Sequence, residues 1–402
     1  MPYRILIHFT EFGSSLGGSE YLPLLFIAEL QRRGCEITLA LNWKSNIEHV
    51  SQLSEIPIDM ARLKVVLIKP KNKFLCKLDA ILPFYRTWNL KKLAKQADVC
   101  ISTVNMFDFG KPAHHFVFLM RHFGDNAFYD YFMHHEPKKG LQLFRQKVRT
   151  WLAEKILRPL LGMRSTRKIL ADPREHIYPN SQYVEETMRS FYGPFTSTVF
   201  YPPTTFDFPP SNVERDELSV VCVGRVIPEK RILDIIDIVE RARSVSGRDL
   251  VLRIAGQLDS THYVEKLKQM SREKTWIQLV GPIYNQNKRD FLLSGTYAVH
   301  ARRDEEFGIA VAEYLKSGNI TIVPDEGDSR EVVDNPVLTY HRNEEAARIL
   351  CRLLDDPAFR DIQRRRGMER AKYFSQEAYL ERQGKLMDGI LSLLDEKHSN
   401  EN

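Results

Sequence analysis

The residues best placed to do chemistry form one run in the second half of the chain, Glu-Glu-Phe-Gly at positions 305–308, followed by a helical pattern that ends at Gly318. A strand pattern at 296–301 precedes the run, so the spacing predicts a strand, a turn and then a helix. A helix start offers unpaired backbone N–H groups and the positive end of the helix dipole, which attract phosphate. Because Gly308 carries no side chain, a ligand can approach the backbone closely there. We therefore predict an anion site at the amides of Phe307, Gly308 and Ile309.

Glu313 lies six residues beyond Phe307 in the same run. At ~1.5 Å rise per residue, it is expected about 9 Å further along the helix. That separation suits a diphosphate at the helix start and a ribose near Glu313, whose carboxylate can accept hydrogen bonds from two vicinal hydroxyls. The alternative is that Glu305 and Glu306 only complement the helix dipole and that Glu313 is a solvated surface charge.

A second group of cations follows the first strand pattern of this half, in the segment Val-Gly-Arg-Val-Ile-Pro-Glu-Lys at 223–230. Arg225 and Lys230 are expected at the carboxyl end of a strand spanning 218–226. A guanidinium fork and an ammonium group both suit phosphate oxygens, so these residues are candidates for binding a diphosphate. An ordinary basic loop would show the same residues.

Two features of the first half are less specific. A glycine-rich turn at 13–19 contains Gly17 and Gly18, but it does not match the dinucleotide fingerprint G-x-G-x-x-G. The turn either brings backbone close to a donor sugar or phosphate, or simply connects a strand to a helix. His122 ends an apolar segment and is expected near the same edge of its sheet, unless it is a packed or surface histidine. The chain contains no Asp-x-Asp and no metal-ligand spacing among its histidines, so no metal is expected.

The elements that position these residues alternate between strands and helices, which predicts parallel sheets with crossover helices. In the first half, strands are expected at 4–9, 36–41, 65–68, 98–103 and 115–121, with helices at 20–33 and 140–157. After a proline-rich linker at 202–217, strands are expected at 218–226, 250–256, 277–281, 296–301, 319–324 and 337–341. The helices of this half are expected at 229–244, 261–272, 287–294, 307–317, 343–354, 357–373 and 375–395. The pattern predicts an α/β protein with two doubly wound domains whose strand ends face a cleft.

Length and composition agree with two globular domains. The chain has 402 residues, a formal net charge of +6, and five scattered cysteines. The segment 138–168 has ten basic residues, one acid, Glu154, and an apolar stripe, so it either lies on an anionic membrane or packs as an amphipathic helix with a solvated basic face. The start of the chain lacks a signal-peptide layout, and no apolar stretch approaches the ~20 residues of a membrane span, so a cytoplasmic protein is expected.

These motifs resemble family 4 of the glycosyltransferases, whose fold is GT-B, and the resemblance extends over almost the whole chain. The residues that carry it are the run from Glu305 to Gly318, the segment 223–230, the Gly17-Gly18-Ser19-Glu20 loop and the stretch from Asn180 to Pro203. The stretch near Pro203 looks closest to mannosyltransferases that use GDP-mannose and extend lipid-linked oligosaccharides. The resemblance implies an acceptor-binding domain at 1–203, a nucleotide-sugar-binding domain at 204–374, and a helix at 375–402 that returns to the first domain.

The resemblance also implies a role for each motif residue. Arg225 and Lys230 would bind the donor diphosphate, Glu305 would contact the donor sugar, and His122 would lie near the sugar and the acceptor. The other donor contacts expected are Gly17, Gly18, Gly256, Phe307, Gly308, Ile309 and Glu313. Catalysis would be retaining and metal-independent, with no cofactor and with a glycan or lipid-linked acceptor.

Some residues depart from the family pattern. Glu306 stands at a variable position, Arg302-Arg303-Asp304 replace small and hydroxylated residues, and Phe123-Gly124 follow His122. Three other functions therefore remain open at this point: a nucleotide-sugar epimerase or hydrolase on the same fold, a non-catalytic binding protein, and a nucleic-acid binder. The last is disfavoured because the basic residues cluster in one segment without interleaved aromatic residues.

Overall fold

The structure is a computed structural model that describes residues 2–13, 18–72, 84–117, 151–202, 213–259, 261–305 and 307–401, together with Cys76, Val148 and Phe208. The chain divides into two compact units. The N-terminal unit comprises Met1–Tyr201 and Arg382–Asn402, and the C-terminal unit comprises Pro202–Glu381.

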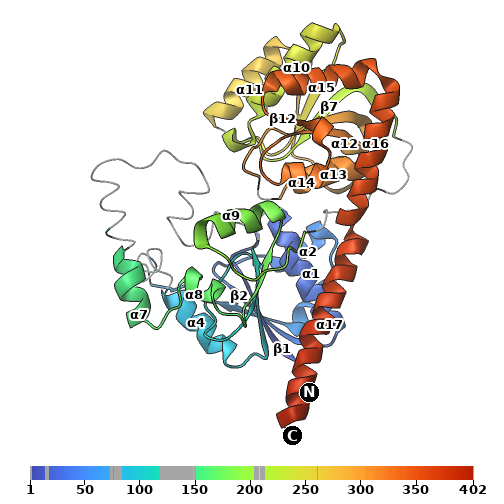
Figure 1. Ribbon diagram of the computed structural model, residues 1–402. Coiled ribbons are helices and arrows are strands. Elements are labelled where there is room, and N and C mark those ends of the chain that lie inside the picture. The colour runs from blue at the N-terminus through green and yellow to red at the C-terminus, as the bar shows by residue number, and fades with distance from the viewer. Residues whose placement is uncertain are drawn as a thin grey trace. The chain divides into compact units, whose positions relative to one another are not determined.

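The N-terminal unit is built on a parallel sheet of six described strands in the order β3-β2-β1-β4-β5-β6 (Figure 1). The strands are β1 (Arg4–Phe9), β2 (Glu36–Leu41), β3 (Leu63–Leu67), β4 (Val99–Ser102), β5 (His114–Val117) and β6 (His176–Pro179). The helices include α1 (Gly18–Arg32), α2 (Ile47–Ser54), α4 (Phe84–Ala94), α7 (Arg158–Leu160), α8 (Thr166–Leu170) and α9 (Gln182–Tyr192). This strand order is that of the doubly wound nucleotide-binding folds.

The two faces of this sheet are covered by different helices. Successive side chains of a strand point to opposite faces. Leu6 of β1 packs in one cluster with Leu90 and Ala94 of α4. On the other face, the Phe26 ring of α1 lies 4.6 Å from the Phe116 ring of β5, centroid to centroid. Both faces are therefore buried, as the apolar strand patterns require.

The C-terminal unit repeats the same plan, with a parallel sheet of six described strands in the order β12-β11-β10-β7-β8-β9. The strands are β7 (Asp216–Val223), β8 (Val251–Ala255), β9 (Ile277–Gly281), β10 (Gly295–Val299), β11 (Ile320–Pro324) and β12 (Thr339–Tyr340). The helices are α10 (Ile232–Ser246), α11 (His262–Glu273), α12 (Asn285–Ser294), α13 (Ile309–Lys316), α14 (Ser329–Val333), α15 (Asn343–Asp355) and α16 (Pro357–Ala371) (Figure 1). The expectation of two doubly wound parallel sheets is confirmed.

The last helix, α17 (Gln376–Glu401), belongs to the N-terminal unit from Arg382 onward. It is held against the end of α1 by Arg33, whose Nη1 lies 2.5 Å from Asp388 Oδ1 and whose Nη2 donates to Gly384 O at 3.1 Å. Tyr3 also donates a hydrogen bond to Asp395 of this helix. These contacts join the last residues of the chain to the first ones.

The sequence-based strands agree with the structure at most positions, but α2, α4, α8, α9 and α14 were not predicted, and three further elements differ. β6 was not predicted, because it has only four residues and includes His176, Tyr178 and Pro179. β7 begins at Asp216 and ends at Val223, so the expected span of 218–226 was shifted toward the carboxyl end. The helix expected at 140–157 lies mostly outside the described residues, and its described end contains a π-turn at Ala153–Leu157.

The five cysteines form no disulfide. All five are free, and four of them are buried. The residues that the structure describes include no helix with both the length and the apolar character of a membrane span.

Candidate functional site

The predicted donor-site residues of the second half of the chain lie near the carboxyl ends of β7 and β10. β7 lies between β8 and β10 in the sheet, so the strand order reverses between β7 and β10. Ligands of open parallel sheets bind beyond the carboxyl ends of strands at such a switch point. Gly224, directly after β7, has a φ of +153°. A Cβ on Gly256 would lie only 1.8 Å from Gly224 O, so glycine at position 256 lets the turn after β7 pack on the end of β8.

Lys230 and Glu305 form an ion pair at this switch point. Lys230 Nζ contacts Glu305 Oε2, although 75 residues separate them in the chain. Nε2 of His300 lies 3.2 Å from the same oxygen, and Nη1 of Arg302 lies 3.3 Å from Glu305 Oε1. The fold thus brings the two separately predicted motifs together.

Burial and charge act in opposite directions on the Glu305 carboxyl. Burial favours the neutral acid, because Glu305 is only 7% exposed. Lys230, His300 and Arg302 outweigh that effect and hold the pKa of Glu305 well below its usual range. The pKa of His300 is also lowered, mainly by burial and against the pull of Glu305. Glu305 is therefore a carboxylate near neutral pH.

Arg225 supplies a cation that no other described residue engages. Its side chain is exposed and makes no hydrogen bond or ion pair with the described residues. The charged side chains at the switch point include three cations, Arg225, Lys230 and Arg302, beside the carboxylates of Asp304 and Glu305. The start of α13 adds the positive end of its dipole. This arrangement can bind an anion with two or more negative charges.

The start of α13 differs in detail from the prediction. The helix begins at Ile309 with Gly308 as its N-cap, and not at Phe307 as the pattern indicated. The Ile309 N–H donates to Phe307 O at 2.9 Å, so it is already engaged. A Cβ on Gly308 would lie 2.8 Å from Val311 Cγ2, and a larger residue would therefore disturb the helix start.

Glu313 is not the solvated surface charge that the alternative interpretation allowed. It is 1% exposed, and its Oε1 accepts a hydrogen bond at 2.8 Å from Lys288 Nζ of α12. A buried carboxylate is tolerated when it is paired in this way. The predicted role of Glu313 in binding a ribose stays a prediction.

Tyr314 ties the helix that carries Glu313 to the end of β7. Its hydroxyl accepts from the Val223 N–H at 2.6 Å and donates to Val223 O at 3.2 Å. Tyr314 is 1% exposed. The phenol thus satisfies both backbone groups of the last β7 residue, where β10 no longer does so, and it fixes the position from which Gly224 and Arg225 project.

Sequence reasoning missed four residues of this site. Tyr314 and Ser329 have no sequence signal, because their partners lie far away in the chain. The Ser329 hydroxyl is buried without a hydrogen-bond partner among the described residues, and a Cβ on Gly308 would lie 3.5 Å from it. His300 ends a strand, and Arg302 departs from the family pattern, so both offered a signal.

Three predicted site features lie wholly or partly outside the described residues. His122 and Gly17 fall in the undescribed ranges, and so does Glu306. Gly18 is the first residue of α1. The basic segment 138–168 is described from residue 151 onward and at Val148.

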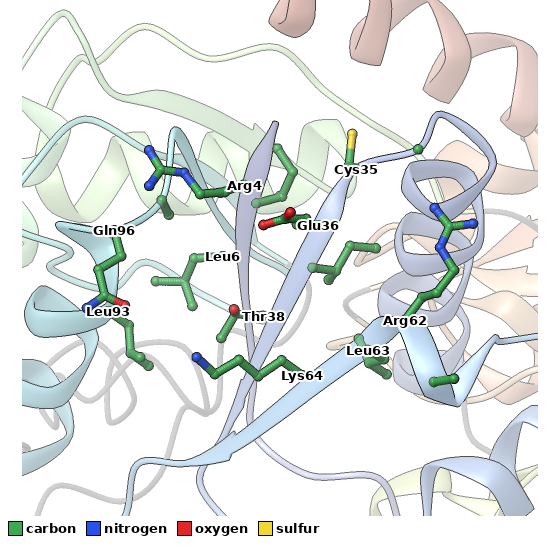
Figure 2. A pocket seen from close by; sticks show the side chains of 15 residues that line it. Arg4, Leu6, Cys35, Glu36, Thr38, Arg62, Leu63, Lys64, Leu93 and Gln96 are labelled. Atoms are coloured by element: carbon green, nitrogen blue, oxygen red, sulfur yellow. The ribbon is translucent and has the colours of Figure 1, made fainter. Parts of the chain in front are cut away.

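A cavity of about 610 Å³ lies in the N-terminal unit, at the amino ends of its strands. Figure 2 shows the side chains that line it. Arg4, Glu36 and Leu63 at the amino ends of β1, β2 and β3 line it, together with Gln96 beyond α4. Arg4 forms an ion pair with Asp98, whose Oδ1 lies 2.7 Å from Arg4 Nη2. None of the predicted site residues lines this cavity.

Comparison with known proteins assigns a family to part of the chain. Residues 204–374 match the family described as Glycosyl transferases group 1. A stretch of 144 residues is 25% identical to the GPI3 subunit of phosphatidylinositol N-acetylglucosaminyltransferase from Saccharomyces cerevisiae, which amounts to 36% of this chain and 32% of that protein. The chain thus matches about a third of the length of this relative.

Solved structures match nearly the whole chain. The crystal structure of Anabaena HepE in complex with UDP and glucose has a TM-score of 0.64 and 14% identity, and covers 96% of this chain and 100% of that one. The structure of WaaG, a glycosyltransferase involved in lipopolysaccharide biosynthesis, has a TM-score of 0.66 and 10% identity, and covers 95% and 99%. The two-sheet architecture and these matches identify a chain with the GT-B fold, of which residues 204–374 match the glycosyl transferases group 1 family.

Proposed function

We propose that this protein transfers a hexose from a nucleotide sugar to a hydroxyl group of a glycan or lipid-linked acceptor. One observation carries the proposal: Lys230 pairs with Glu305 at the switch point, between the turn that carries Arg225 and the start of α13, in a region that matches the glycosyl transferases group 1 family. The cations of this site suit a diphosphate, and the adjoining carboxylate suits sugar hydroxyls.

The proposed reaction breaks the bond between the sugar C1 and the diphosphate oxygen. The acceptor oxygen forms the new bond to C1 on the same face of the sugar, and its proton passes to the departing diphosphate. Arg225, Lys230 and the Gly308 amide would stabilise the charge that develops on that diphosphate, because they are in place before the reaction. When the diphosphate binds, it would compete with Glu305 for Lys230 and free a carboxylate oxygen for the donor sugar.

The donor is the less defined part of the proposal. GDP-mannose is the first candidate, because the sequence resembles mannosyltransferases. UDP-glucose and UDP-N-acetylglucosamine are tested beside it, because HepE was crystallised with UDP and glucose, and the GPI3 subunit belongs to an N-acetylglucosaminyltransferase. Glu313 would accept hydrogen bonds from the ribose of any of these donors.

Metal independence is part of the proposal, since cations of the protein take the place of a divalent ion. Activity after treatment with EDTA should match untreated activity, and a strict requirement for Mn²⁺ or Mg²⁺ would contradict this part. The N-terminal unit would bind the acceptor.

We also propose that the segment 138–168 contacts an anionic membrane, but not through all of its basic residues. Arg164 is engaged, because its Nη1 lies 2.7 Å from Glu175 and its Nε lies 2.9 Å from Asp108. Trp151 and Leu160 are exposed apolar side chains of the same segment. Sedimentation with phosphatidylglycerol vesicles should capture the protein, whereas phosphatidylcholine vesicles should not. Equal recovery with both would contradict an electrostatic contact.

A thermal-shift panel of nucleotide sugars tests the donor, because a ligand that binds the native state raises its melting temperature. At least one donor should stabilise the protein and yield a glycosylated acceptor. Release of free sugar alone would indicate a hydrolase, and a changed sugar on an intact donor would indicate an epimerase. Binding without turnover would favour a non-catalytic protein, and no binding would remove the proposal.

A further inference from the structure

The N-terminal unit has its own switch point, between β1 and β4, and four polar side chains gather there. His8 near the end of β1 lies in register with Ser102 at the end of β4. Asn42 directly follows β2, and its Oδ1 lies 3.4 Å from His8 Nε2. Asn105 lies three residues beyond Ser102 in the chain. The four side chains are exposed by 2% or less.

These side chains hold polar atoms that the described protein does not satisfy. His8 Nδ1, Asn42 Nδ2, Ser102 Oγ and both polar atoms of the Asn105 amide are buried and have no hydrogen-bond partner in the described residues. Buried polar groups in native proteins nearly always have a partner, because leaving one unsatisfied is destabilising. Five such atoms at the carboxyl ends of adjacent strands therefore point to a polar ligand.

The cluster is neutral, which limits what that ligand can be. Burial above all, with smaller effects of Arg86 and His115, lowers the pKa of His8 to about 3. His8 is therefore uncharged near neutral pH, and Ser102 and the two amides carry no charge. The cluster offers donors and acceptors together, which suits hydroxyl groups, because each hydroxyl both donates and accepts. A phosphate, which only accepts when ionised, would leave the acceptor atoms unsatisfied.

We propose that His8, Asn42, Ser102 and Asn105 form a subsite for hydroxyl groups of a neutral sugar, on the acceptor side of the reaction. The inference rests on the proposed function and names the chemistry that its acceptor presents. The Phe107 ring, whose centroid lies 4.1 Å from that of His8, packs against the cluster. Since the four side chains are covered, binding requires a local opening, which folded proteins undergo without unfolding globally.

Two variants separate a binding role from a structural one. Ser102→Ala and Asn105→Leu replace unsatisfied polar groups with apolar groups of similar size, a change that is nearly neutral or stabilising when no partner is lost. Each variant should keep the melting temperature of the wild type or exceed it. Each should also weaken binding of the sugar by about fivefold, the usual effect of one neutral hydrogen bond. Ser219→Ala is the matched control, because Ser219 Oγ is equally buried and unsatisfied but lies in the first half of β7.

The probes are methyl glycosides of mannose, glucose and N-acetylglucosamine, titrated by saturation-transfer NMR without a donor. Weakened binding in Ser102→Ala and Asn105→Leu, with Ser219→Ala unchanged, would support the subsite. Absence of glycoside binding by the wild type, equal binding by all variants, or a fall in melting temperature that parallels the loss would overturn it. Titration of UDP and GDP into the same preparations tests the proposed function separately, since donor binding at the C-terminal unit does not depend on Ser102 or Asn105.

Discussion

The switch points of the two units share a topology and differ in chemistry. Each lies between the first and fourth strands of a sheet with the same strand order. In the C-terminal unit the gap holds charged side chains that pair with one another, led by Lys230 and Glu305. In the N-terminal unit it holds the neutral cluster around His8, in which buried polar atoms lack partners among the described residues. The side chains at the strand ends, and not the fold, decide which ligand each unit can take.

The two switch points also differ in the residue that hydrogen-bonds the end of the first strand. In the N-terminal unit a local residue completes the end of β1: Thr103 donates to His8 O through its N–H at 3.1 Å and through its hydroxyl at 3.2 Å. In the C-terminal unit Tyr314, far away in the chain, completes the end of β7. A charged turn that must hold Arg225 in place is therefore anchored to the same helix that carries Glu313.

The largest expected effect is the loss of Lys230. Lys230→Ala removes a diphosphate ligand and leaves Glu305 without its main counter-charge. We expect kcat/KM to fall about a hundredfold, or ~2.7 kcal/mol. Steady-state kinetics with the donor found in the panel measures it. Lys268→Ala is the control, because Lys268 pairs with Glu265 at 2.8 Å on the exposed face of α11. Near-normal turnover of Lys230→Ala would remove the charged site from the mechanism.

A similar effect is expected from the loss of Glu313 in α13. Glu313→Ala should weaken donor binding about a hundredfold, because the ribose hydroxyls lose their acceptor and Lys288 loses its buried partner. Calorimetric titration with UDP and with GDP measures the change. Glu344→Ala, at an exposed carboxylate of α15, should bind like the wild type. Unchanged affinity of Glu313→Ala would leave Glu313 with a structural role alone.

His8 at the neutral switch point should respond to acid before Glu305 at the charged one. The pKa of His8 is about 3 in the folded protein and about 6.5 when unfolded. Unfolding therefore takes up a proton, and the stability present above pH 6.5 is lost as the pH falls toward 3. At pH 5 the protonation of His8 on unfolding lowers the free energy of unfolding by about 2 kcal/mol. Because the pKa of Glu305 is lowered, its paired carboxylate stabilises the folded protein fully until the pH falls below about 4.3, the usual pKa of a Glu side chain.

Urea unfolding at pH 7 and pH 5 measures this contrast. His8→Gln cannot take up that proton, so it should lose less stability between the two pH values than the wild type does. His262→Gln changes an exposed histidine of α11 and should behave like the wild type. If His8→Gln and the wild type lost the same amount, the neutral state of His8 would not be what distinguishes this switch point.

A smaller effect is expected when the Tyr314 hydroxyl, which anchors the turn after β7, is removed. Tyr314→Phe leaves the Val223 N–H and C=O without the hydroxyl, so the turn that carries Arg225 should loosen. We expect the affinity for UDP or GDP to fall about tenfold, the effect of one to two neutral hydrogen bonds, while kcat changes less. Hydrogen exchange at Val223–Arg225 should rise. Tyr297→Phe removes another buried hydroxyl, which contacts Leu353 O at 3.4 Å, and should leave both measurements unchanged. Equal effects of the two variants would indicate general destabilisation.

The sequence was sufficient for the fold class and for half of the charged site. Strand-helix alternation predicted both sheets, because each element carries its own periodicity. The sequence singled out Arg225, Lys230 and Glu305 because they follow strand patterns, and Glu313 because of its distance from the predicted helix start.

The remaining features depend on contacts between distant segments. The sequence alone did not predict that Lys230 would pair with Glu305, that Tyr314 would bind Val223, or that Gly256 would pack on Gly224. The neutral cluster around His8 was missed for the same reason, since single polar residues at strand ends carry no pattern. β6 was too short to show any periodicity.

A crystal structure of the protein with UDP or GDP bound tests the central claim most directly. The account predicts that the diphosphate lies within hydrogen-bond distance of Arg225 and the Gly308 amide, and that Lys230 has moved from Glu305 to a phosphate oxygen. A diphosphate bound away from the start of α13, with Lys230 still paired to Glu305, would contradict it.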